Sequence, residues 1–304
     1  MKGQTIPMPR LLVALDGSHL AEAVLPLVRT LAMALGAQIT LLHVLEHHPP
    51  TTIHGERHLT TKAEADAYLN GLAEQLRADG FVAETHVHAN PQQDVAGSIA
   101  AHATELNVDM IVLAAHGHGG IREWVVGRIP QQVAAKAGRA VMIVPVPTQK
   151  DLTAIHRIML PVDQAGEARA AIPITTLLAT AFKAELILET VVPTPGTVPG
   201  EAGVATVFLP RTTAELLKIA EDQARANLEH LANLFAGEGI SATTYIQRGD
   251  PARELAHAIS MHNPDMVIMA THGRVGLDGL WAGSVGPRVV SAATCPVLLV
   301  PIQE

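Results

Sequence analysis

Two short, continuously apolar runs constrain this chain more than any other feature of its sequence. Met110–Leu113 and Met266–Met269 each lead into a loop that contains glycine. Such a run, without alternation, is typical of a parallel strand buried on both faces. Helical spacing of apolar residues resumes after the second loop, from Val285 to Ala293. A strand, a glycine loop and a helix start suit phosphate, because a helix N-terminus offers unpaired N–H groups and a partial positive charge.

The two glycine loops are copies of one pattern. The second copy runs Ala270–Gly273, nine residues, then Gly283–Val285, and the first runs Ala114–Gly117, nine residues, then Gly127–Ile129. The pattern resembles the glycine motif of the universal stress protein family, G-x-x-G, nine residues, G-S/T. Both copies have alanine at the first glycine position, and the first copy has Arg128 in place of the serine.

The rest of the chain alternates strand and helix patterns, twice over. We expect further strands at Leu11–Leu15, Ile39–Leu45, Phe81–His88, Ala140–Val144, Ile158–Val162, Glu185–Val191, Ile240–Gln247 and Pro296–Val300. This alternation predicts an α/β fold with a parallel sheet and helices on both faces, in two copies. The resemblance implies tandem Rossmann-like domains (flavodoxin-like, and similar to adenine nucleotide alpha hydrolases), each with a five-stranded parallel sheet. We place these domains at residues 1–147 and 156–304.

Composition excludes several classes of protein. A net charge of −8 and a pI near 6.0 argue against a nucleic-acid binder, which would show a basic face. No apolar run approaches the roughly 18 residues of a membrane span. One cysteine, Cys295, allows no intrachain disulfide and fits a reducing compartment. We therefore expect a soluble, cytoplasmic protein without nucleic-acid or membrane partners.

For the second half, the resemblance implies an adenine nucleotide site. Its positions correspond to Pro161, Asp163, Thr190, Ala270, Gly273, Gly283, Ser284 and Val285. The carboxyl ends of parallel strands share one edge of a sheet, and ligands bind there. Ser284 would supply a hydroxyl at the helix start, while Gly283 would leave room for a phosphate oxygen. The alternative is that these glycines only permit a tight turn.

The first half matches the same pattern less completely. Asp16, Val44, Gly117 and Gly127 correspond to family positions. Arg128 could pair with a phosphate, or it could fill the site and exclude the ligand. The sequence leaves both outcomes open, a nucleotide bound in the first half and an empty site.

Catalysis is not expected from these residues. The chain has no G-x-x-x-x-G-K-[ST], and Arg274 is the only basic residue between Gly273 and Gly286. Phosphoryl transfer needs positioned charge and an oriented water. We expect a stress-response or regulatory module that binds ATP with Mg²⁺ and hydrolyses it slowly at most, and is not an enzyme in the usual sense.

Histidines cluster in the first half, with ten of the sixteen between His43 and His118. Imidazole suits zinc, so a Zn²⁺ site built from His54, His58, His86 and His88 is one hypothesis. Polar loops also carry histidine without any ligand. A further alternative is a nucleotide-independent interaction or scaffold protein whose pockets are vestigial, with or without zinc.

The two halves are expected to form a pseudo-dimer within the chain. Single-domain relatives usually associate through the last strand, here Ala140–Val144 and Pro296–Val300. An exposed apolar edge strand invites pairing, so covering it within the chain is physically sensible. A homodimer is the alternative use of the same edges.

The two glycine loops generate a prediction about asymmetry. We expect one tightly bound ATP per chain, in the second half, because Gly127-Arg128 lacks the serine contact that Gly283-Ser284 supplies. A lost charged hydrogen bond costs roughly 1.5–3 kcal/mol, or about 10- to 100-fold in affinity. Gly283→Val should abolish binding, and Gly127→Val should leave it nearly unchanged, by calorimetry. The reverse ranking, or two equal sites in the parent, would show that Arg128 assists binding.

Overall fold

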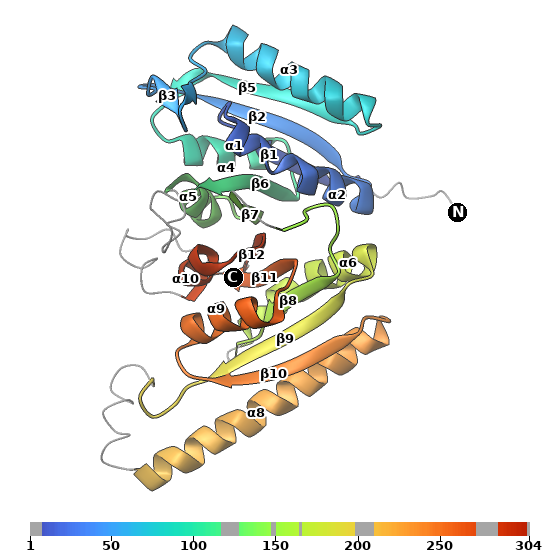
Figure 1. Cartoon of the computed structure of the whole chain (residues 1–304), viewed down its shortest axis with the longest axis vertical. Coiled ribbons are helices and arrows are strands. Elements are labelled where there is room, and N and C mark those ends of the chain that lie inside the picture. The colour runs from blue at the N-terminus through green and yellow to red at the C-terminus, as the bar shows by residue number, and fades with distance from the viewer. Residues whose placement is uncertain are drawn as a thin grey trace. The chain divides into compact units, whose positions relative to one another are not determined.

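The computed structural model describes residues 8–116, 128–146, 150–163, 166–197, 210–271 and 285–302 (Figure 1). These residues form two compact units, and the chain passes from the first to the second between Ala154 and Ile155. Each unit contains its own parallel sheet with helices packed on it. In the described part of the chain, no helix is long and apolar enough to cross a bilayer.

The N-terminal unit contains a five-stranded sheet in the order β7-β6-β1-β2-β5, with every neighbouring pair parallel. Its elements are β1 (Arg10–Ala14), α1 (His19–Glu22), α2 (Leu25–Leu35), β2 (Gln38–Glu46), β3 (Thr52–Ile53), β4 (Glu56–Arg57), α3 (Lys62–Ala78), β5 (Ala83–Gln92), α4 (Val95–Glu105), β6 (Met110–His116), α5 (Arg128–Lys136) and β7 (Ala140–Val146). The short strands β3 and β4 pair as an antiparallel hairpin.

The C-terminal unit repeats this arrangement in the order β10-β9-β8-β11-β12, again parallel throughout. Its elements are β8 (Arg157–Pro161), η1 (Glu167–Ala171), α6 (Ile172–Phe182), β9 (Glu185–Val192), α8 (Pro210–Gly237), β10 (Ala242–Arg248), α9 (Pro251–His262), β11 (Met266–Thr271), α10 (Val285–Ala292) and β12 (Val297–Pro301). The long helix α8 lies along β10 at the edge of its sheet (Figure 1).

The predicted fold class is confirmed, and the physical reason is visible in the strands. Seven consecutive residues of β2, Ile39 to Leu45, are buried. Successive side chains of a strand point to opposite faces, so unbroken burial means that both faces are covered. The apolar run Met110–Leu113 forms the first four residues of β6, and Met266–Met269 forms those of β11.

Two local features go beyond the periodicity of the sequence. Apolar residues recur at helical spacing from Ser18 to Gly36, but the segment forms two helices, α1 and α2, and Pro26 lies in the first turn of α2. Proline has no N–H and its ring clashes with the preceding turn, so it begins a helix more readily than it continues one. The polar segment 47–61, which has no strand or helix periodicity, contains the β3–β4 hairpin.

Glu189 is an unusual buried residue of the C-terminal sheet. It lies in the middle of β9 and is fully buried, and its Oε2 is 3.5 Å from Nε2 of His262 at the end of α9. The His262 ring lies against Tyr245 of β10, with ring centroids 4.2 Å apart. Burial raises the pKa of Glu189 from its ordinary 4.5 to about 7, and the Gln247 side chain offsets only part of this. The folded C-terminal unit therefore favours the protonated acid.

Glu189→Gln should make the unfolding free energy less dependent on pH between 4.5 and 7. A raised carboxyl pKa contributes stability below pH 4.5 that is lost as pH rises through 7, and the loss amounts to about 3 kcal/mol. The pKa of His262 is lowered, chiefly by burial, so its contribution runs the opposite way. The measured quantity is therefore the difference in urea unfolding between variant and parent across this range. Glu185→Gln, on the exposed start of β9, is the control. A difference that stays constant with pH would contradict the buried-acid interpretation.

Gly17 makes a close contact that a side chain could not. It follows β1 with φ +92°, and a Cβ there would lie 2.7 Å from Leu59, whereas Gly80 has φ +91° and nothing within 4 Å. Gly17→Ala and Gly80→Ala should share the backbone cost of about 1–2 kcal/mol, and Gly17→Ala should lose a further ~1–3 kcal/mol through overpacking. Urea midpoints measure both. Adding Leu59→Ala should remove the excess, and equal losses in the single variants would contradict the contact.

Candidate functional site

Polar groups organise the turn that follows β1 in the N-terminal unit. Oδ1 of Asp16 accepts hydrogen bonds from the backbone N–H of Ser18 at 2.9 Å and from its hydroxyl at 2.7 Å. The Ser18 hydroxyl oxygen in turn accepts the N–H of Ala21 at 3.2 Å and caps α1. Asp16 and the start of α1 are thereby held at the carboxyl end of the sheet.

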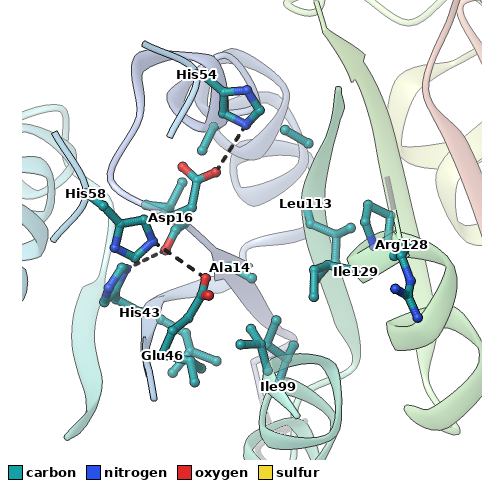
Figure 2. A pocket seen from close by; sticks show the side chains of 17 residues that line it. Ala14, Asp16, His43, Glu46, His54, His58, Ile99, Leu113, Arg128 and Ile129 are labelled. Carbon is teal, nitrogen blue, oxygen red and sulfur yellow. Dashed lines mark hydrogen bonds and ion pairs between the residues drawn. The ribbon is translucent and has the colours of Figure 1, made fainter. Parts of the chain in front are cut away.

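The β3–β4 hairpin reaches back to this turn. Oε1 of Glu56 accepts the backbone N–H of His19 at 3.0 Å. Nε2 of His54 lies 3.7 Å from Oδ2 of Asp16. These contacts join the hairpin to the turn after β1 and bring two of its histidines, His54 and His58, beside the sheet edge (Figure 2).

A cavity of about 230 Å³ lies at the carboxyl ends of β1, β2 and β6. Its lining residues are Ala14, Leu15, Asp16, Ala21, Leu42, His43, Val44, Glu46, His54, His58, Val95, Ile99, Leu113, Ala114, Arg128, Ile129 and Pro130. Most of this surface is apolar. Figure 2 shows the acids and histidines on one side of the cavity and Arg128, from the start of α5, on the other. Such a cavity can hold a flat apolar body that carries polar groups at its ends.

His43, His58 and Glu46 form the polar end of this cavity. The His43 side chain is 2% exposed, and its Nδ1 lies 2.8 Å from the carbonyl oxygen of Leu15. The His58 side chain is equally buried, and its Nε2 lies 3.5 Å from Oε1 of Glu46. Burial is the main reason that the pKa of His43 is lowered, so the ring stays neutral at ordinary pH.

In the C-terminal unit, Asp163 occupies the place of Asp16. Its Oδ1 and Oδ2 accept the N–H groups of Ala168 at 2.8 Å and Glu167 at 3.1 Å, at the start of η1. The Thr190 hydroxyl donates to the carbonyl oxygen of Val162. Pro161 ends β8, and Ala270 precedes the last residue of β11. The structure thus brings four of the predicted residues to one sheet edge.

The remaining predicted residues divide into two groups. Val44 lines the N-terminal cavity and Val285 begins α10. Gly117, Gly127, Gly273, Gly283 and Ser284 lie outside the described residues. Their predicted roles at the phosphate stay predictions.

The four predicted zinc ligands do not lie together but in two separate pairs. His54 and His58 line the cavity, while His86 and His88 of β5 contact His102 of α4. Nδ1 of His88 and Nε2 of His102 are 2.8 Å apart. Among the residues that the structure describes, no group of three or more His, Cys, Asp or Glu side chains is arranged to hold a metal ion.

The register of the two sheets identifies a residue that the sequence analysis missed. Leu15 N–H donates to Leu42 O in the first unit, and Val162 N–H donates to Glu189 O in the second. His43 therefore corresponds to Thr190, whereas Val44 corresponds to Val191. The signal was present in the sequence, because 147 positions separate His43 from Thr190 as they separate Asp16 from Asp163. Glu46 and His102 had no comparable signal.

Comparisons with known proteins agree with this repeated architecture. Residues 8–145 and 154–301 each match the model of the Universal stress protein family. The chain is 33% identical over 87 residues to Universal stress protein MJ0531 of Methanocaldococcus jannaschii, a match that spans 29% of this chain and 49% of that protein. It is 30% identical over 147 residues to Universal stress protein Sll1654 of Synechocystis, spanning 47% of this chain and 84% of that protein.

Solved structures show the same fold over nearly the whole length. A universal stress protein from Archaeoglobus fulgidus superposes with a TM-score of 0.73 at 16% identity, covering 98% of this chain and 100% of that one. The functionally unknown protein PA1789 from Pseudomonas aeruginosa gives a TM-score of 0.69 at 17% identity, covering 97% and 93%. Two adjacent matches to one family model cover almost all of the sequence, and the chain therefore belongs to the universal stress protein family, with two family domains in tandem.

Proposed function

We propose that this protein binds an adenine nucleotide and that the complete ligand is ATP with Mg²⁺. We further propose that the N-terminal cavity binds the nucleoside part of this ligand. The observation that carries the proposal is the cavity of about 230 Å³ at the carboxyl ends of β1, β2 and β6. Ligands of open parallel sheets bind at this edge. The cavity is smaller than the about 300–1,000 Å³ of sites that enclose a drug-sized ligand. It therefore suits a base and sugar better than a whole triphosphate.

The charges around the cavity support a phosphorylated ligand. Arg128 is the first residue of α5 and lines the cavity opposite the acids and histidines, with its side chain exposed, so its positive charge and the start of this helix lie on the same side. Both favour an anion, and a guanidinium group can bind phosphate through two parallel hydrogen bonds. Asp16 and Glu46 lie on the other side, where their oxygens can accept from ribose hydroxyls or a base amino group.

The C-terminal unit, where the sequence predicts the tight ATP site, is the second part of the proposal, and the N-terminal cavity is proposed as a further, weaker site. Asp163, Thr190 and Pro161 lie at the carboxyl edge of their own sheet, as the corresponding residues do in the N-terminal unit, and the sequence places Gly283-Ser284 before α10. This supports a nucleotide site there with a serine hydroxyl at the helix start. We further propose a regulatory role with slow hydrolysis at most, because the sequence contains no G-x-x-x-x-G-K-[ST] motif and phosphoryl transfer depends on positioned charge.

A nucleotide-independent interaction role is the second candidate, and α8 favours it. Leu216 and Ile219 are 61% and 52% exposed on the first half of this helix, although both are large apolar residues. Exposed apolar surface of this kind marks contact sites when it is contiguous. This role becomes the better account if no adenine nucleotide binds the intact protein.

Ala14→Leu should remove nucleotide binding in the N-terminal unit. Ala14 ends β1 and lines the cavity, so three added carbons would fill space that the ligand needs. Calorimetry with ATP on the intact protein should show the loss of one binding event, while the urea midpoint confirms folding.

Pro161→Leu is the matched control, because Pro161 holds the corresponding place at the end of β8. It should leave the N-terminal event unchanged. Unaltered ATP binding in Ala14→Leu would exclude the cavity as the site, and the absence of any ATP binding by the parent protein would exclude the proposed function.

A further inference from the structure

Three histidines gather between β5 and α4, outside the cavity. His86 and His88 lie on one face of β5 because side chains alternate along a strand, whereas Thr85 points to the other face and donates to Asn70 of α3. The ring of His102 in α4 has its centroid 4.5 Å from that of His86 and 5.0 Å from that of His88. The His102 side chain is 9% exposed, so the cluster belongs to the packing of the helix on the strand.

Four side chains continue this cluster as a line of hydrogen bonds, which we call the histidine chain. It runs from Gln92 Nε2 to His88 Nε2 at 2.9 Å, from His88 Nδ1 to His102 Nε2 at 2.8 Å, and from His102 Nδ1 to Glu105 Oε2 at 3.1 Å. Gln92 is the last residue of β5 and Glu105 is the last residue of α4. The histidine chain therefore connects the two elements through side chains alone.

The acceptors at its two ends determine where each hydrogen of the histidine chain lies. The Gln92 amide nitrogen also donates to the carbonyl oxygen of Asn90 at 3.0 Å, so its other hydrogen points to His88. His88 Nε2 therefore accepts, and a neutral ring then carries its hydrogen on Nδ1 and donates it to His102. His102 in turn carries its hydrogen on Nδ1, because the carboxylate of Glu105 only accepts. Both rings are thus neutral, with every ring nitrogen paired.

The histidine chain has no place for a further proton. A proton on His88 Nε2 would face the amide hydrogens of Gln92, and a proton on His102 Nε2 would face the N–H group of His88. Either position sets one donor against another, so uptake of a proton breaks a hydrogen bond. Both lone pairs are already used, so neither ring is free to bind a metal ion. This agrees with the described residues, in which no three such side chains are arranged to hold one.

The surroundings of His102 also favour its neutral form. Burial is the main reason that its pKa is lowered from the ordinary 6.5, and His86 and His88 act in the same direction. Glu105 acts in the opposite direction, but its side chain is 68% exposed, and water weakens its effect. β2 and α5 also pack on α4, and their charged or titratable residues are His43, Glu46, Arg128 and Lys136. The first three line the cavity, and Lys136 pairs with Asp94 at 2.6 Å.

The histidine chain adjoins two sides of the N-terminal cavity. Val95 and Ile99 of α4 line the cavity, and His102 lies one turn beyond Ile99 in the same helix (Figure 2). Gln92 pairs with Glu46, another lining residue, where β5 and β2 end. Loss of a hydrogen bond in the chain therefore removes support from the α4 side and from the β2 side together.

We propose that the histidine chain is an acid-sensitive link between β5 and α4: in its neutral form it holds the wall of the N-terminal cavity, and on taking up a proton it breaks and weakens ligand binding there. The link itself stands on the contacts within the N-terminal unit. Its effect on binding rests on the proposed function, because it needs a nucleotide in the cavity. For one proton, linkage gives a loss of up to about 10-fold in affinity per pH unit as pH falls below 6.5.

The first measurement tests the link. Nitrogen-15 NMR of the intact protein near pH 7.5 should show His88 and His102 as neutral rings with hydrogen on Nδ1. The unfolding free energy in urea should decrease as pH falls below 6.5, because the unfolded chain takes up protons that the folded unit rejects. His102→Gln keeps an acceptor for His88 and a donor for Glu105 but does not titrate. Its unfolding free energy should therefore depend less on pH than that of the parent.

His48→Gln is the matched control, because it removes an exposed imidazole of the same unit. It should keep the pH dependence of the parent. If His102→Gln does not fold, His88→Asn takes its place, since its amide can still donate to His102. Hydrogen on Nε2 of either ring in the NMR spectrum would overturn the link. A pH dependence that the folded variant leaves unchanged would do the same.

The second measurement tests the effect on the cavity. Calorimetry with ATP on the intact protein follows the binding event that Ala14→Leu removes. Between about pH 6.5 and 5.5, the affinity of this event should fall up to about 10-fold further in the parent than in His102→Gln. Titration of ATP itself cancels in this comparison, because both proteins bind the same ligand.

The outcomes separate this proposal from the proposed function. Equal losses of affinity in the parent and in His102→Gln would overturn the control of the cavity and leave nucleotide binding intact. Failure of the parent to bind ATP near pH 7.5 would overturn the proposed function, and with it the effect on binding. The link between β5 and α4 is then judged by the NMR and urea measurements, which need no ligand.

Discussion

The structure depends on a parallel strand that is buried on both faces and must still end at a polar edge. β1 and β8 are such strands, and the chain leaves each of them next to an aspartate. Asp16 and Asp163 accept backbone N–H groups of the following turn, which would otherwise be left without partners near the sheet. These hydrogen bonds fix where the next helical segment begins. The aspartate that follows each strand therefore also shapes the edge of the sheet where the candidate site lies.

The two units share this backbone arrangement but differ in the side chains that it presents. His43 and Thr190 bond the same carbonyl position, yet only His43 has a second nitrogen, which is buried without a hydrogen-bond partner among the described residues. One position earlier, the N-terminal unit buries Leu42 and the C-terminal unit buries Glu189. A leucine needs no partner, whereas a buried carboxyl is easier to keep protonated than charged. The two units therefore share the same backbone hydrogen bonds, but the side chains at corresponding positions differ in charge and in hydrogen-bonding groups.

The N-terminal cavity combines an apolar wall with charges of opposite sign at its two sides. Among these polar groups, His43 and His58 are buried, Asp16 and Glu46 are half-buried, and Arg128 is exposed. The two histidines therefore act in surroundings of lower dielectric than water. The β3–β4 hairpin contributes to the cavity by bringing His54 and His58 to the strand ends. These histidines lie far in the sequence from Arg128, which lines the same cavity. A ligand with a flat body, donor groups at one end and negative charge at the other would complement the site.

Sequence patterns predicted the α/β class, the two repeats and the positions of the central strands. Continuous apolar runs such as Met266–Met269 are local signals, and alternation of strand and helix leaves few topologies open. These patterns also placed Asp16 and Asp163 correctly at strand ends. The tertiary structure alone decided that His58 meets Glu46, that His88 meets His102 instead of the hairpin histidines, and that Glu189 is buried. These contacts depend on strand register and on which side chains face one another across the sheet, and periodicity along a single chain does not encode either.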